Sequence, residues 1–137
     1  MDDERRQRLR DLGARLLHLH TLLLAGERRV HEAAHGPMAS TELLQAVLHH
    51  ERFAWLRALS GVVARIDEAL DAHDPVVPVD AESLAREVQA LLRSGGDSAF
   101  ERKYRAALQD SADVVMAHAE VVKILRMSEP EPPAPPG

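Results

Sequence analysis

The chain has no cysteine and very few aromatic residues, and each shortage narrows what the protein can be. Without cysteine it has no disulfide, no thiolate metal ligand and no cysteine nucleophile. Because Phe53, Trp55, Phe100 and Tyr104 are the only aromatic residues, Leu, Val and Ala must fill most of the core. Strands would require more aromatic and β-branched residues, so this composition favours packed helices.

Long apolar runs and catalytic loops are also missing from the sequence. Runs such as Leu22 to Ala25 are too short to span a membrane, and the charged N-terminus lacks the apolar core of a signal peptide. No Gly-x-Ser-x-Gly turn and no Gly-Lys-Ser or Gly-Lys-Thr phosphate loop occurs. We therefore expect a cytoplasmic, non-catalytic protein that does not interact with membranes.

The charge balance argues against nucleic acid as a partner. The formal charge is -5, from 22 acidic and 17 basic side chains, and acidic residues concentrate between Asp67 and Glu87. Binding to phosphates depends on clustered Lys and Arg. The arginines near the N-terminus are interspersed with acidic residues, which is typical of a solvated, salt-bridged helix start.

Apolar spacing predicts an all-α fold, an up-and-down helical bundle with two long antiparallel helices, one short helix and one long C-terminal helix. The expected helices cover residues 3–36, 40–72, 80–93 and 98–127. The first helix carries a seam with three-and-four spacing, interrupted at Gly26, where the missing side chain either admits a neighbouring helix or is a tolerated weak point. The seam residues are Leu9, Leu12, Leu16, Leu19, Leu23, Val30 and Ala33.

Glycine, proline and capping residues predict where these helices begin and end. Gly36-Pro37 ends the first helix, and Ser98-Ala-Phe-Glu101 is a capping box that begins the last. Two prolines make residues 74–79 a stiff linker. We expect one helical domain at 1–127 and a disordered Pro-rich tail at 128–137.

The second helix is expected to bury an apolar stripe of its own. Part of the hairpin that the first two helices form is expected to stay uncovered. The third helix is much shorter than the hairpin beside it, so an apolar face remains exposed to water. Burial of that face predicts a homodimer or a helical protein partner, although a ligand groove would serve as well. The stripe residues are Leu44, Leu48, Trp55, Leu59, Val62, Ile66 and Leu70.

One short motif matches a zinc-protease signature. His31-Glu-Ala-Ala-His35 has the letters of H-E-x-x-H, in which two histidines hold zinc and the glutamate is the general base. The match lies in the last turn before Gly36-Pro37, and no Gly-x-x-His extension follows. Histidine near a helix C-terminus is favoured by the helix dipole without any metal.

A second set of polar residues falls on the expected core faces. Glu27, His31, Glu51 and His118 would project into the bundle, and two glutamates with histidines resemble the ligand sets of helical metal sites. This set predicts a site for Zn, Fe or Mn as the alternative to a protein without a cofactor. The other interpretations are glutamates at the core edge paired with arginines, and a Glu-His network that makes association depend on pH.

Three segments resemble a group of small bacterial helical proteins for which no activity is established. They are Thr41-Glu-Leu-Leu44, His50-Glu-Arg-Phe-Ala-Trp-Leu-Arg57 and Ile66-Asp-Glu-Ala-Leu70. The resemblance implies a bacterial, soluble, helical protein and assigns no site residues. Together with the residue patterns it supports a non-catalytic interaction protein, with a metal- or cofactor-binding bundle as the alternative.

Overall fold

The computed structural model describes residues 3–71, 81–92 and 98–128, and in these ranges the fold is all-α. Six α-helices and one 3-10 helix, η1, make up these residues, and no strand occurs among them. The all-α prediction is therefore confirmed. The helices are α1 (Asp3–His35), α2 (Ser40–His49), η1 (Glu51–Phe53), α3 (Leu56–Asp71), α4 (Ala81–Leu91), α5 (Ala99–Asp110) and α6 (Ala112–Ser128).

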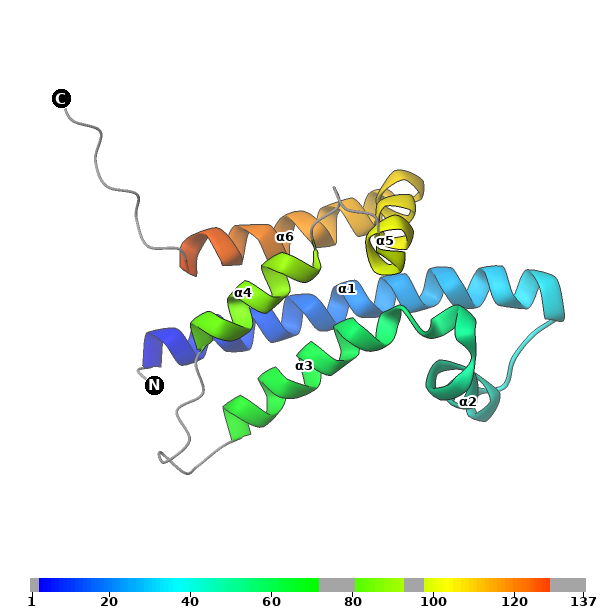
Figure 1. Cartoon of the computed structure of the whole chain (residues 1–137), viewed down its shortest axis with the longest axis horizontal. Helices are drawn as coiled ribbons and strands as arrows, with labels where there is room; N and C mark the ends of the chain where they lie inside the picture. The colour runs from blue at the N-terminus through cyan, green and yellow to red at the C-terminus, as the bar shows by residue number, and fades with distance from the viewer. Residues whose placement is uncertain (1–2, 72–80, 93–97, 129–137) are drawn as a thin grey trace.

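Helix α1 is the long central element on which chiefly α3 and α6 pack (Figure 1). It ends as predicted, because Gly36 adopts a φ of 88° and its N–H donates to the Glu32 carbonyl over 2.7 Å. Its seam is buried from Leu9 to Leu23. The prediction fails beyond that point, where Val30 is 54% exposed and Ala33 also faces water.

Helices α3 and α6 cover most of the α1 seam. Helix α3 lies tightly against α1 at Gly13, where an added Cβ would lie 2.9 Å from Cγ2 of Ile66. Gly13 is therefore the glycine that admits a neighbouring helix of the same chain. Gly26 has no such neighbour, since a Cβ there would meet only the Arg29 guanidinium at 3.8 Å.

The single helix expected over 40–72 is wrong, because the chain breaks between α2 and α3. His50 is extended, with φ -79° and ψ 135°, and its Nδ1 accepts the Arg52 backbone N–H over 3.0 Å. In one continuous helix Phe53 and Trp55 would point about 200° apart. The break lets both rings enter the core, and it also interrupts the second of the two expected long helices.

The single helix expected over 98–127 is also interrupted. Ser111 is extended, and its Oγ accepts the Val114 N–H over 3.3 Å, which caps the start of α6. The serine half of the predicted capping box at the start of α5 is confirmed, since Ser98 Oγ accepts the Glu101 N–H over 3.1 Å. Serine oxygens thus cap the starts of both α5 and α6 by offering the backbone a local partner.

The third predicted helix is confirmed as α4, within two residues of its expected ends. The linker at 74–79 and the tail beyond Ser128 lie outside the described residues. The division into a 1–127 domain and a 128–137 tail stays a prediction. No helix in the described part of the chain combines the length and apolar character that crossing a membrane requires.

Candidate functional site

The four predicted metal ligands lie in different surroundings. Glu27 lines a groove between α1 and α5, and its carboxylate lies 3.9 Å from the Lys103 ammonium. The Nδ1 atom of His118 is hydrogen-bonded to the Tyr104 hydroxyl, and Glu51 is exposed in η1. Over residues 3–71, 81–92 and 98–128, no three His, Asp or Glu side chains gather where they could hold one metal ion. The metal site stays a prediction.

His31 is the one polar residue among those described that is buried in the core, with 8% of its surface exposed. Its ring centroid lies 4.5 Å from that of His35, 5.0 Å from that of His50 and 5.8 Å from that of Phe53. Its Nδ1 is buried without a hydrogen-bond partner. Burial lowers the pKa of His31, so its neutral form is favoured.

The H-E-x-x-H motif is thus divided between two environments. His31 and His35 lie one turn apart with their rings in contact. Glu32, the residue that matches the general base, forms an ion pair with Arg28 on the same helix. Arg28 in turn donates to the Met38 carbonyl over 3.0 Å. Glu32 therefore helps to hold the chain after α1 and has a structural role.

The groove between α1 and α5 has a volume of about 360 Å³. Its walls come from α1 between Leu22 and Val30, from α5, and from the first turn of α6. Apolar side chains and Gly26 make up much of its lining, and Glu27 contributes a carboxylate that is 16% exposed. The remaining lining residues are Leu23, Arg29, Trp55, Lys103, Ala106, Ala107, Asp110, Ser111 and Val114.

A second unusual surface is the outer face of α2. None of the ten residues of this helix is buried. Leu44 is 57% exposed and Leu48 is 52% exposed, although both were predicted to lie in the core. Leu43, Ala46 and Val47 pack partly against the core instead. Apolar side chains on both faces of this short helix are the signal that the predicted single stripe overlooked.

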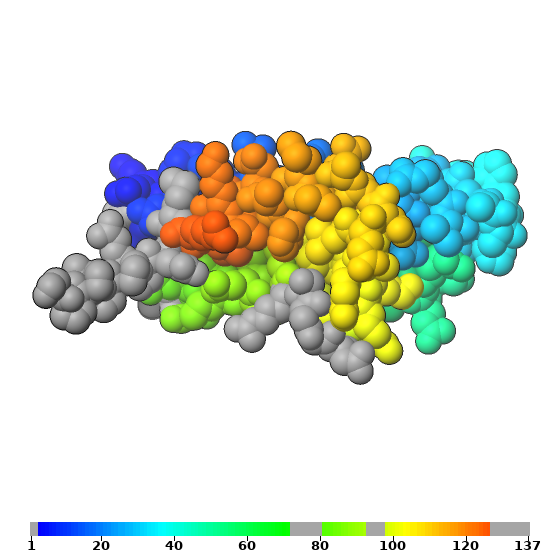
Figure 2. All heavy atoms as spheres, turned by 90° about the horizontal axis from the view of Figure 1, so that it is seen from above, coloured from blue at the N-terminus to red at the C-terminus, as the bar shows by residue number. Residues whose placement is uncertain are grey.

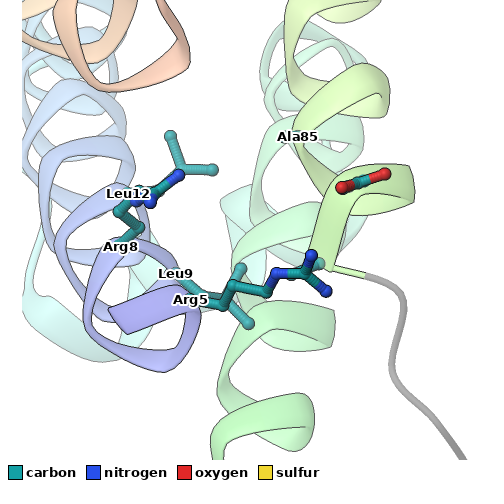
Figure 3. Close-up of a pocket in the computed structure, with 7 residues that line it drawn as sticks. Arg5, Arg8, Leu9, Leu12 and Ala85 are labelled. Atoms are coloured by element: carbon teal, nitrogen blue, oxygen red, sulfur yellow. The ribbon is translucent and has the colours of Figure 1, made fainter. Parts of the chain in front are cut away.

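A small pocket near the start of α1 is too limited for a ligand. Its volume is about 50 Å³, roughly that of one or two waters. Figure 3 shows Arg5 and Arg8 beside Leu9 and Leu12 on α1, with Ala85 on α4. We regard this pocket as a packing gap between α1 and α4.

Comparison with protein families, with curated proteins and with solved structures finds no match to this chain. The function must therefore be argued from the groove, the histidine cluster of His31, His35 and His50, and the exposed face of α2.

Proposed function

We propose that the protein is a non-catalytic helical binding module that associates with a second copy of itself. The observation that carries this proposal is the α2 surface, where Leu44 and Leu48 lie one turn apart and are more than half exposed. Soluble proteins rarely leave contiguous apolar surface in water, and a symmetric dimer is the commonest way to cover it.

The charge of α2 favours another copy of this chain as its partner. Glu42 is the only Asp, Glu, Lys or Arg in the helix, in a chain of which 28% is charged. Burying this face of α2 against a second copy therefore desolvates little charge. If the chain alone stayed monomeric, the partner of α2 would instead be a different helical protein with an apolar surface.

The test is the mass of the protein in solution as a function of concentration. We expect sedimentation equilibrium of the 15.1 kDa chain to give twice that mass in the high-micromolar range. Leu44→Ser combined with Leu48→Ser should give the monomer mass, since it makes the α2 face polar without touching the buried core. Leu17→Ser is the matched control, because Leu17 is equally exposed but lies on α1.

A monomer at every concentration for the unaltered protein would overturn the proposed self-association. A dimer that the α2 double variant leaves intact would show that another surface is used. Cytoplasmic location and bacterial origin remain predictions of the sequence.

Metal binding is a second candidate function, and the proximity of His31 to His35, whose ring centroids lie 4.5 Å apart, favours it. Two histidines one helical turn apart are a common pair of ligands for Zn and similar ions. Elemental analysis of untagged protein, with thermal unfolding in the presence and absence of a chelator, tests this candidate. Stoichiometric Zn, Fe or Mn and a lower Tm with chelator would support it, whereas no metal and an unchanged Tm would reject it.

A further inference from the structure

We infer that the groove beside Gly26 receives α2 of a second copy of the chain, an assignment that rests on the proposed self-association. It replaces a general expectation of dimerisation with a specific pair of surfaces, the α2 face around Leu44 and Leu48 and the groove between α1 and α5.

Among residues 3–71, 81–92 and 98–128, none occupies the groove. A Cβ at Gly26 would find only the Arg29 guanidinium within 4 Å, so no neighbouring helix lies against this point. A glycine inside a helix costs about 1 kcal/mol relative to alanine. At Gly13 this cost is offset by close packing against Ile66 of α3, whereas at Gly26 no contact with a neighbouring helix offsets it. Ala106 and Ala107 line the groove as well, so small residues on both α1 and α5 leave room for another helix.

The dimensions of the groove and of α2 agree. The α1 segment from Leu22 to Val30 is about 12 Å long, and a ten-residue helix such as α2 is about 15 Å long. Leu44 and Leu48 are separated by about 6 Å along the axis, so both fit within that segment. Two apolar anchors four residues apart are the usual pattern when a helix binds in a groove.

The chemistry of the two surfaces agrees as well. Leu22, Leu23 and Val114 give the groove an apolar lining, and the exposed Val30 extends it toward the end of α1. The charged lining of the groove is balanced, with the cations Arg29 and Lys103 and the anions Glu27 and Asp110, so Glu42 in the first turn of α2 meets no net like charge there.

Helix α2 does not reach the groove of its own molecule. In Figure 1, α2 lies below the last turns of α1, whereas α5 lies above that helix. Leu43 and Val47 hold α2 against its own core, so Leu44 and Leu48 remain available to a second molecule. Figure 2 shows the last turns of α1 extending past α5 and α6, where a partner has access. Each copy offers one helix and one groove, and a twofold axis pairs them reciprocally.

Filling the groove tests this inference while leaving α2 unchanged. Gly26→Leu places a side chain in the open groove, and the helix gains propensity, so the fold should persist. Gly61→Leu is the matched control, since Gly61 is also a helical glycine whose added Cβ would meet only an arginine, Arg65, at 3.6 Å. We expect Gly26→Leu to raise the dimer dissociation constant at least about tenfold and Gly61→Leu to leave it unchanged.

Mixing variants separates this contact from packing of α2 against α2. Gly26→Leu keeps an intact α2, and the Leu44→Ser/Leu48→Ser variant keeps an open groove. If α2 occupies the groove, an equimolar mixture forms a mixed dimer with one of the two contacts, and this mixed dimer is tighter than the homodimer of either variant.

Three outcomes would overturn the inference. In the first, Gly26→Leu dimerises as tightly as the unaltered chain, which leaves self-association standing but places it elsewhere. In the second, the Gly61→Leu control loses the dimer equally, so the groove is not specific. In the third, the unaltered chain is a monomer, and the proposed function fails together with this assignment.

Discussion

The Tyr104 hydroxyl and the His118 Nδ1 form a hydrogen bond of 2.6 Å across the break between α5 and α6. Tyr104 is fully buried, and His118 is half-buried. Burial raises the pKa of Tyr104 and lowers that of His118, so both groups are neutral near pH 7. The bond fixes the angle between two helices that the sequence joins only through Ser111.

Tyr104→Phe should destabilise the fold by about 1 kcal/mol, because it removes one buried hydrogen bond while keeping the ring. Urea unfolding monitored by circular dichroism measures the change. A double-mutant cycle with His118→Leu should return a coupling of similar size. A coupling near zero would show that the two side chains contribute independently.

Acid should destabilise the protein through histidines that burial keeps neutral. Burial lowers the pKa values of His20, His31 and His118 below the ordinary 6.5. The unfolded chain therefore binds more protons than the folded one below that pH. The contribution of these three histidines to the free energy of unfolding is fully present above pH 6.5. It is lost as the pH falls from 6.5 toward their pKa values in the folded protein.

His31→Phe should make the Tm less sensitive to acid, since it replaces a buried ionisable ring with an apolar one beside Phe53. His35, His50 and Arg52 also lower the pKa of His31, and Glu32 acts in the opposite direction. Thermal unfolding between about pH 7.5 and 5.5 tests this, with His18→Phe on the exposed side of α1 as control. Equal slopes for both variants would contradict a special role for His31.

Two glycine-to-alanine changes in α1 should have opposite effects. Gly13→Ala forces a Cβ against the buried Ile66, and such overpacking costs about 1–3 kcal/mol, more than the gain in helix propensity. Gly26→Ala meets open space and should stabilise the monomer by up to about 1 kcal/mol. Denaturant unfolding of both variants at low protein concentration compares them. A stable Gly13→Ala protein would mean that α3 moves away from α1 at little cost.

Ser98→Ala should weaken the start of α5 by about 1 kcal/mol, since Ser98 Oγ accepts the Glu101 N–H. Ser83→Ala, at an exposed position inside α4, is the matched control. Urea midpoints for the two variants should differ accordingly. Equal midpoints would show that water replaces the cap.

The sequence identified what depends on local chemistry. The end of α1 at Gly36, the cap at Ser98 and the buried seam from Leu9 to Leu23 were predictable, because each depends on residues close together in the chain. The breaks at His50 and Ser111 were not, because each replaces a helical turn with a side-chain cap that only tertiary packing makes favourable.

The candidate site residues were likewise predictable only where local sequence determines their position. The sequence placed Glu27 and His31 on the inner part of α1, and the structure has both largely shielded from water. It could not place Glu51, because the register of residues after His50 depends on the break. It also assigned Leu44 and Leu48 to the core, since one stripe through residues 44–70 assumes one continuous helix.

The seam of α1 lies between α3 on one side and α6 on the other, so its cover is completed only by a helix that follows it in the chain by more than 75 residues (Figure 1). While the ribosome is still making α3 to α5, the α6 side of Leu9 to Leu23 has no cover. The nascent chain therefore presents an apolar stripe of the kind that chaperones bind and that promotes aggregation. Closing contacts so far apart in sequence also slows folding, relative to a bundle of neighbouring hairpins.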